Sequence, residues 1–481
     1  MSSHVILTDS GPVSGTCRDG IRRHLGIPYA EAPVGARRFA LPVPIAPWVE
    51  ARDATAYGPT SPQSPYRGMA GKYLESIVIA GDENLTVNVW SPDKGDRAAV
   101  MLWFHGGAFE RGASALSTYD GSAFARDGVV FVSANYRLGI EGFSVLPDAP
   151  RNIGVGDAAE ALRWTHRNAA NFGGDPSRIT IFGESAGGAM VAALLARDDL
   201  RPLIAGAIIQ SGPLDPARLR LAAQPTRDVA RALGCRPTAA ALRSYTPELL
   251  VACRDRLTEK ATLLRGAPGF NTTVDPVTLP ISPRHALRVA NVPVLIGTTT
   301  DEYRLFYTPR ELAALNTRTY AALALAKRIP RGTWGAYSRV LPGASAGEII
   351  GHVLTDLILR MPAIEIATAR TAPTFVYELA WKSPISELGA AHALDVGFVF
   401  DALNDPAAQR MLGENAPQRL ADHMHGDWIR FAKTGDPGWA GLAMSGRIRR
   451  YDTVTEDVPI PRAHALSTLA RRAFAVPTPV A

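Results

Sequence analysis

The sequence of 481 residues predicts an α/β fold, in which a mostly parallel, twisted central sheet is flanked by helices. Short, continuous apolar runs at residues 100–104, 129–132 and 179–182 have the composition of strands that are buried on both faces. Two segments rich in helix formers, residues 157–171 and 186–196, alternate with these runs. Such alternation is typical of a parallel sheet with helices on both faces.

The rest of the chain continues this pattern with two long interruptions. Apolar runs at residues 205–209 and 294–296 predict further strands, whereas residues 214–290 and 303–372 look mainly helical. Insertions of this kind can form a cap over the carboxyl ends of the strands, where open α/β sheets bind ligands. No linker separates the parts, so we expect one catalytic domain over residues 1–481. Residues 58–71 contain three prolines and predict an exposed loop.

Composition and charge exclude several classes of protein. Hydrophobic residues make up 46% and charged residues 20% of the chain, which is ordinary for a globular protein. No apolar stretch approaches the roughly 20 residues that span a bilayer, so no membrane partner is expected. The net charge is +6, but the arginines are scattered, which favours a solvated surface over a nucleic-acid site.

The N-terminus and the cysteines bear on the cellular compartment. Residues 1–15 have no basic segment followed by an apolar one and no small-residue cleavage site, so we expect a cytoplasmic location. Cys17, Cys235 and Cys253 are few, odd in number and far apart. They fit neither a disulfide framework nor a metal motif, and we expect buried small side chains.

One pentapeptide carries the strongest chemical signal: Gly183-Glu184-Ser185-Ala186-Gly187. It follows an apolar strand and opens a helix of small residues, which is the context of a nucleophile elbow. The turn is sharp, and the two glycines provide the lack of bulk that it needs. Ser185 is therefore the predicted nucleophile.

A second glycine-rich motif follows the strand that ends at residue 104: His105-Gly106-Gly107-Ala108-Phe109. An acyl-transfer intermediate carries an oxyanion that needs backbone N–H donors about 3 Å away. We assign the N–H groups of Gly107, Ala108 and Ala186 to this oxyanion hole, with Gly106 and His105 shaping the loop.

A serine nucleophile needs a base and an orienting carboxylate, which in α/β-hydrolases follow the serine in the order acid, then histidine. Asp301 and Glu302 lie after an apolar strand, and the residues alone do not choose between these two acids. The base candidate is His392, in a loop after the apolar run at residues 374–379. His423 and His425 are rivals, but they lie on an amphipathic helical pattern and are expected to be structural.

With these motifs in order, the chain resembles the type-B carboxylesterases, a group with the α/β-hydrolase fold that includes the bacterial p-nitrobenzyl esterases and the cholinesterases. The resemblance runs from about residue 5 to residue 451. Its further motifs are Gly26-Ile27-Pro28-Tyr29-Ala30, Asp82-Glu83-Asn84-Leu85-Thr86-Val87-Asn88-Val89-Trp90, Asn135-Tyr136-Arg137-Leu138-Gly139, Phe172-Gly173-Gly174-Asp175-Pro176, Gln210-Ser211-Gly212 and Phe431-Ala432-Lys433-Thr434-Gly435-Asp436-Pro437.

The resemblance implies a role for each matching residue. It places the nucleophile on Ser185, the acid on Glu302 and the base on His392. It also implies a buried Glu184 beside the nucleophile and a supporting role for Ser211.

The chain departs from the family pattern at three places. Asn84 replaces the cysteine of the signature, so the disulfide of secreted relatives cannot form there. Tyr303 replaces the usual glycine after the acidic pair. Residues 59–86 hold no tryptophan, and the cholinesterases use one there to bind quaternary ammonium, so a choline-ester specialist is not expected.

The expected activity is hydrolysis of a small-molecule carboxylic ester through an acyl-enzyme on Ser185, with neither metal nor organic cofactor. Because His392 must be neutral to act as base, activity should fall as pH drops through about 6.5. The same triad acting on amide, carbamate or thioester bonds is the first alternative, and a non-catalytic binding homologue is the second. The sequence carries no signal for the oligomeric state.

Overall fold

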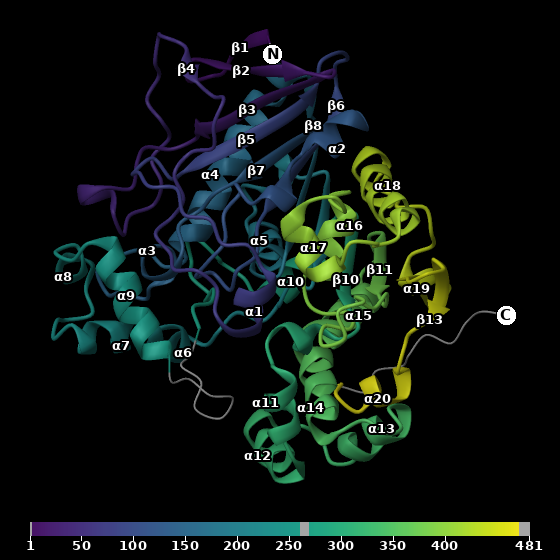
Figure 1. Cartoon of the computed structure of the whole chain (residues 1–481). Coiled ribbons are helices and arrows are strands. Elements are labelled where there is room, and N and C mark those ends of the chain that lie inside the picture. Colours follow the sequence, from purple (N-terminus) through teal and green to yellow (C-terminus); the bar gives the residue numbers. More distant parts are fainter. Residues whose placement is uncertain (1, 260–268, 471–481) are drawn as a thin grey trace. The chain divides into compact units, whose positions relative to one another are not determined.

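The computed structural model describes residues 2–259 and 269–470 (Figure 1). These residues form two compact units. The first unit falls within Met1–Pro65, Ser76–Ile208 and Asp215–Ala290. The second falls within Tyr66–Glu75, Ile209–Leu214 and Asn291–Ala481. The division lies inside one strand, β9 (Gly206–Gln210).

The first unit is built on a run of hydrogen-bonded strands. In sheet order they are β1 (Ser2–Leu7), β2 (Pro12–Arg18), β3 (Ile21–Pro28), β5 (Thr86–Pro92), β7 (Val129–Ala134), β6 (Ala98–Phe104) and β8 (Gly174–Glu184), and β4 (Arg52–Asp53) pairs with β2. From β1 to β7 the neighbours in this order pair antiparallel, whereas β4 is parallel to β2, and β6 is parallel to both β7 and β8. Strands were predicted within β6, β7 and β8, and all three are confirmed.

The register of β6 against β8 positions the chemistry. Phe104, the last residue of β6, lies opposite Gly183, the penultimate residue of β8. Because the two strands are parallel, the loops that follow them leave the sheet at the same edge. The sequence therefore brings both glycine-rich motifs to one place through strand pairing alone.

Helices of the first unit cover this sheet and fill the first insertion. They are α2 (Ser122–Arg126), α3 (Gly139–Phe143), α4 (Ile153–Asn168), α5 (Ala186–Leu194), α6 (Leu219–Ala222), α7 (Gln224–Ala232), α8 (Ala239–Leu242), α9 (Pro247–Thr258) and α10 (Pro283–Val289). Every residue of α5 is buried, and this helix packs against α4 and β8. Figure 1 shows α7, α8 and α9 grouped together.

The second unit has its own strand run. β10 (Val294–Thr299), β11 (Thr374–Leu379) and β12 (Arg447–Tyr451) are parallel, and β13 (Glu456–Pro459) pairs antiparallel with β12. Its helices are α1 (Gly68–Tyr73), α11 (Pro309–Ala314), α12 (Thr317–Lys327), α13 (Thr333–Val340), α14 (Ala346–Thr355), α15 (Met361–Ala369), α16 (Leu394–Val399), α17 (Pro406–Leu412), α18 (Gln418–Thr434), α19 (Leu442–Ser445) and α20 (Ala463–Ser467).

Residues 58–71 differ from the exposed loop that their prolines predicted. Thr60, Ser61 and Met69 are buried, and α1 begins at Gly68. The Ser61 hydroxyl donates a hydrogen bond of 2.7 Å to the carbonyl of Tyr136. Prolines mark where regular structure stops, but they do not report which side chains then pack inward, and the prediction of full exposure is wrong.

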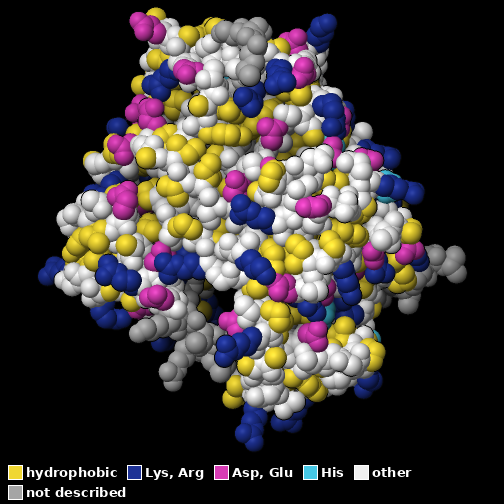
Figure 2. Space-filling view, viewed as in Figure 1, with side chains coloured by type: hydrophobic (Ala, Val, Ile, Leu, Met, Phe, Trp, Pro, Cys, Tyr) yellow, Lys and Arg dark blue, Asp and Glu magenta, His cyan; other side chains and the backbone are white. Residues whose placement is uncertain are grey.

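The surface and the cysteines bear on the other expectations from composition. Lys and Arg side chains are interspersed with Asp and Glu over the face in Figure 2. No helix in the described part of the chain is long and apolar enough to cross a membrane. The three cysteines are free thiols; Cys253 is buried as expected, but Cys17 and Cys235 are only half-buried.

Candidate active site

Ser185 lies at the turn between β8 and α5 in a strained backbone conformation. Its φ is 56° and its ψ is −120°, a region that L-residues with a side chain rarely adopt. Such strain persists only where the surrounding structure enforces it, and it is frequent at catalytic residues. This is the conformation that a nucleophile elbow requires.

Two glycines make this turn possible because no side chain fits at either position. A Cβ at Gly187 would lie 1.9 Å from the carbonyl oxygen of Phe104. A Cβ at Gly183 would lie 2.5 Å from the carbonyl carbon of Gly187. The close packing of β6, the turn and α5 therefore explains the glycine spacing in the pentapeptide.

The loop after β6 lies directly against this turn. A Cβ at Gly106 would lie 2.5 Å from Oε2 of Glu184 and 3.2 Å from Cβ of Ser185. Gly107 and Ala108 then adopt φ values of 115° and 55°, which turn the backbone sharply. We call residues 107–111 the oxyanion loop, after the role predicted for its first two N–H groups.

His105, the residue before Gly106, is a buried and neutral side chain. It is buried, its ring stacks on Tyr136 with centroids 4.5 Å apart, and the Tyr136 hydroxyl donates to the His105 carbonyl at 2.7 Å. Burial lowers the pKa of His105 to about 4, although the hydrogen bond with the Gly106 carbonyl opposes this shift. His105 therefore stays uncharged at neutral pH and shapes the loop.

Ala186 is the first residue of α5. The N–H groups of the first helical turn have no partner within the helix, and the helix dipole places partial positive charge at this end. Ala186 is buried beside Ser185, so its N–H fits the third predicted oxyanion donor.

The second unit holds a buried pair, Glu302 and His392. Nδ1 of His392 lies 2.5 Å from Oε2 of Glu302. The other oxygen, Oε1, accepts hydrogen bonds from the Ser211 hydroxyl at 2.6 Å and from the Thr299 N–H at 2.8 Å. With Nδ1 held by a carboxylate, Nε2 is the ring nitrogen that can exchange a proton with another group.

Opposing effects set the pKa of Glu302. Burial alone would raise it, but the positive charge of His392 and the hydrogen bonds from His392, Ser211 and Thr299 outweigh burial. The pKa of Glu302 is therefore lowered from its ordinary value. Its carboxylate is ionised at neutral pH and can stabilise a protonated His392.

Asp301, the rival acid in the sequence, makes different contacts. Its Oδ2 accepts the N–H of Ala390 at 3.0 Å, and its own N–H donates to the Ala390 carbonyl at 2.8 Å. Asp301 thus holds the loop that precedes His392, whereas Glu302 contacts the imidazole itself. The acidic neighbours have separate tasks.

The rival histidines lie on α18, as their amphipathic pattern predicted. Nδ1 of His423 is 2.9 Å from the hydroxyl of Thr455, and Nδ1 of the buried His425 is 2.7 Å from the carbonyl of Val399. Both rings are held by structural hydrogen bonds.

Sequence reasoning missed two neighbours of this pair. The Thr299 N–H binds Glu302, and Phe306, which is 55% exposed, has its ring centroid 5.1 Å from that of His392. Their positions at the end of β10 and just after the acid could have marked them.

Tyr303, the departure from the family glycine, packs on His352, and Gly351 leaves room because a Cβ there would be 2.4 Å from the Tyr303 ring.

The structure thus places Ser185, Gly106, Gly107, Ala108 and Ala186 together in the first unit, and Glu302 with His392 in the second. Among the described residues, no group of three or more His, Cys, Asp or Glu side chains has the arrangement of a metal site.

Comparisons with known proteins show the family of the chain. The model of the carboxylesterase family matches residues 2–455. Para-nitrobenzyl esterase of Bacillus subtilis (strain 168) is 37% identical over 91% of this chain and 91% of its own length. Phenmedipham hydrolase of Pseudarthrobacter oxydans is 32% identical over 96% of this chain and 97% of its own.

A solved structure of a PNB esterase superposes with a TM-score of 0.85 at 32% identity, and covers 98% of this chain and 100% of that one. The expected fold, an α/β-hydrolase with a mostly parallel sheet flanked by helices, is thereby confirmed. The chain belongs to the carboxylesterase family and is a carboxylic ester hydrolase.

Proposed function

We propose that this enzyme hydrolyses small-molecule carboxylic esters through an acyl-enzyme on Ser185, with His392 as base and Glu302 as the orienting acid. The observation that carries the proposal is the strained conformation of Ser185 between β8 and α5, because an ordinary serine in a turn needs no such strain. The Glu302–His392 pair supplies the complementary chemistry.

In the first step His392 accepts the proton of the Ser185 hydroxyl while the oxygen attacks the ester carbonyl. Glu302 keeps Nδ1 of His392 protonated, which leaves Nε2 as the acceptor, and it stabilises the imidazolium that forms. The imidazolium then gives its proton to the departing alcohol, and Ser185 retains the acyl group.

In the second step water attacks the acyl-enzyme, again with His392 as base, and the acid is released. In both steps negative charge develops on the former carbonyl oxygen. The N–H groups of Gly107, Ala108 and Ala186 stabilise this charge as preorganised donors that need no rearrangement.

The first substrates to assay are para-nitrobenzyl and p-nitrophenyl esters, because a relative over most of this chain has the former in its name. The matching anilides, carbamates and thioesters form the second arm of the panel. Comparable turnover of ester and anilide would favour the amide alternative, since amide cleavage makes greater demands on protonation of the leaving group.

The decisive experiment is labelling with a fluorophosphonate probe together with ester turnover. Wild type should label and hydrolyse, whereas Ser185→Ala should do neither and should lose about 10⁶ in kcat. Ser244→Ala, at an exposed hydroxyl bonded to the Ala241 carbonyl, is the control and should behave as wild type. Labelling that survives in Ser185→Ala would refute the assignment, and a wild type that neither labels nor turns over would favour the binding homologue.

Two expectations about the protein as a whole also stand as proposals. Asn84 at the position of the family cysteine supports a reducing, cytoplasmic location. The match of one family along residues 2–455 supports a single catalytic domain with helical insertions at about 214–290 and 303–372.

A further inference from the structure

The oxyanion loop carries unusual backbone strain. Gly107, Ala108 and Phe109 have successive φ values of 115°, 55° and 60°, and two of these residues have side chains. A non-glycine residue with positive φ is strained and persists only when its surroundings over-determine it. The loop therefore needs anchors beyond β6, which holds only its upstream end.

The next two residues of the loop form ion pairs with two consecutive residues of α9. Glu110 accepts from Nη2 of Arg254 at 2.8 Å and from its Nε at 3.4 Å. Arg111 donates through Nη2 to Oδ1 of Asp255 at 3.1 Å. On the loop the acidic residue precedes the basic one, whereas on the helix the basic residue precedes the acidic one. Each residue therefore pairs with one of opposite charge. We call these four residues the clasp.

The clasp is shielded from solvent on most sides. Side-chain exposures are 6% for Arg254, 12% for Glu110, 18% for Arg111 and 12% for Asp255. Charge pairs this buried are screened little by salt, and removing one partner leaves the other charge uncompensated. The clasp therefore fixes its geometry more firmly than exposed ion pairs do.

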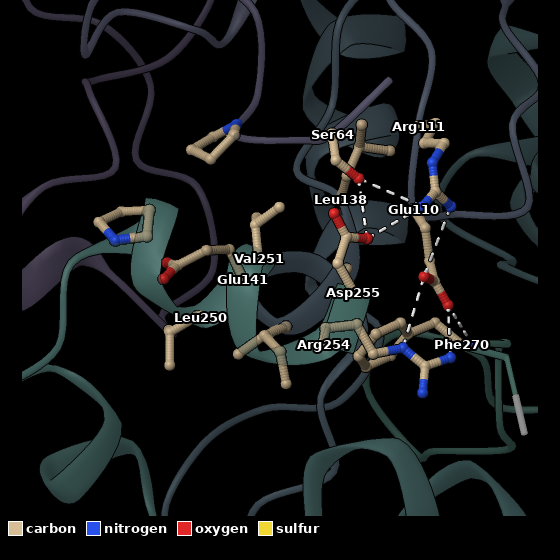
Figure 3. Close-up of a pocket in the computed structure, with 14 residues that line it drawn as sticks. Ser64, Glu110, Arg111, Leu138, Glu141, Leu250, Val251, Arg254, Asp255 and Phe270 are labelled. Carbon is tan, nitrogen blue, oxygen red and sulfur yellow. Dashed lines mark hydrogen bonds and ion pairs between the residues drawn. The ribbon is translucent and has the colours of Figure 1, made fainter. Parts of the chain in front are cut away.

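Additional contacts make the clasp a network, and its residues line a pocket (Figure 3). The Ser64 hydroxyl donates to Asp255 at 2.9 Å and accepts from Arg111 at 3.2 Å. The guanidinium of Arg254 lies 5.3 Å from the ring centroid of Phe270. Arg254 is thus oriented by a carboxylate and by an aromatic face.

The backbone couples the clasp to the oxyanion donors over a very short path. The carbonyl of Gly107 accepts the N–H of Glu110 at 3.0 Å and the N–H of Arg111 at 2.9 Å. A shift of the Glu110 or Arg111 side chain therefore pulls on the peptide that follows Gly107, and that peptide carries the Ala108 N–H.

We propose that Arg254 and Asp255 are positioning residues, which hold the N–H groups of Gly107 and Ala108 in the geometry that binds the oxyanion. The inference rests on the proposed role of this loop in ester hydrolysis. It extends that role to α9, within the helical insertion.

The test compares Arg254→Met and Asp255→Asn with wild type in steady-state hydrolysis of a p-nitrophenyl ester. A misplaced oxyanion donor raises the free energy of the transition state more than that of the ground state. We therefore expect kcat to fall roughly 10–100-fold while KM changes by less than about threefold. Inhibition by a trifluoromethyl ketone, which binds as a tetrahedral oxyanion, should weaken by the same factor as kcat/KM. Arg254→Lys should recover part of the loss, since it restores the charge without the two-pronged contact.

Arg449→Met is the matched control. Arg449 has a carboxylate partner, Asp457, at 2.7 Å and lies 4.6 Å from the ring centroid of Trp439, so it repeats the contacts of Arg254 on β12. This variant should lower thermal stability and leave kcat and ketone binding unchanged. Glu110→Gln provides a milder change within the clasp if Arg254→Met does not fold.

The results separate this proposal from the function that underlies it. Wild-type turnover that is abolished by Ser185→Ala establishes the hydrolase independently of the clasp. If the clasp variants then lose thermal stability but keep wild-type kcat and ketone affinity, or resemble Arg449→Met in all three measurements, the clasp is only structural and the inference is wrong.

Discussion

At the scale of single residues, neighbours of the same chemistry have different tasks. Asp301 and Glu302 are adjacent acids, yet only Glu302 contacts the His392 imidazole, while Asp301 binds the backbone of Ala390. A short 3₁₀ turn begins at Glu302, and Asp301 is the residue that precedes it. An assignment based on charge alone would treat them as equivalent.

Glu302→Gln and Asp301→Asn form a matched pair that tests this division. Loss of the carboxylate on His392 should reduce kcat about 10⁴-fold, because the imidazolium is no longer stabilised and its tautomer is no longer fixed. Asp301→Asn keeps an oxygen acceptor for the Ala390 N–H and should cost less than about tenfold, or 1.4 kcal/mol. Steady-state kinetics on one ester decides the question, and equal losses in both variants would contradict it.

The pH dependence follows from the same pair. The pKa of Glu302 is lowered, so this carboxylate stays ionised throughout the range in which an ordinary histidine, with a pKa near 6.5, titrates. A protonated His392 cannot accept the Ser185 proton. In the acidic part of the pH profile, kcat/KM should therefore fall tenfold per pH unit, which is the slope of a single ionisation. Activity that stays flat down to pH 4 would contradict His392 as base.

The ionisation of Glu302 also makes the stability of the folded protein depend on pH. A depressed native pKa means that Glu302 contributes stability above its unfolded pKa of about 4.3, and that this contribution is lost as pH falls through the native value.

At the scale of elements, the elbow depends on how closely β6, β8 and α5 approach one another. The carbonyl of Phe104 occupies the space where a side chain at position 187 would begin. The close packing of helix and strand therefore helps to enforce the strained φ of Ser185, and the glycines of the pentapeptide permit it.

A pair of glycine substitutions measures that packing. Gly187→Ala should lower the free energy of unfolding by about 3 kcal/mol, because its Cβ would lie 1.9 Å from backbone and the strand must move. Gly426→Ala, at an exposed position inside α18 with no atom within 4 Å of a Cβ, should raise it by about 0.5–1 kcal/mol. Denaturant unfolding checks both, and a stable Gly187→Ala would refute the close approach.

At the scale of the whole molecule, stability is carried by packing without covalent cross-links. Trp90, Trp103, Trp164 and Trp428 are fully buried, whereas the three cysteines remain free thiols. A chain of 481 residues buries enough apolar surface to need no disulfide.

The thermal unfolding midpoint should therefore be the same with and without millimolar dithiothreitol. No disulfide exists for the reductant to break, and the unfolded state is equally unconstrained in both conditions. Differential scanning fluorimetry in the two buffers measures this, with a disulfide-containing protein as positive control. A midpoint that drops in reductant would show that a pair of these cysteines is oxidised.

The elbow and the clasp show most clearly how much of the site can be predicted from the sequence. Strand runs, the pentapeptide and the loop motif can be read locally, since alternation of apolar and glycine-rich segments depends on neighbours in the chain. The contacts Glu110–Arg254 and Ser211–Glu302 join residues 144 and 91 positions apart. No local pattern encodes such pairs, although the complementary order of Glu110-Arg111 and Arg254-Asp255 could have suggested one of them.

The sequence by itself determined the α/β fold class, the family and the candidate residues Ser185, Glu302 and His392, because each depends on short motifs in a fixed order. The tertiary structure alone decided what Asp301 binds in place of the imidazole, how strained Ser185 is and which side chains contact the oxyanion loop. These are properties of backbone direction and of close packing between distant segments, and they exist only once the chain has folded.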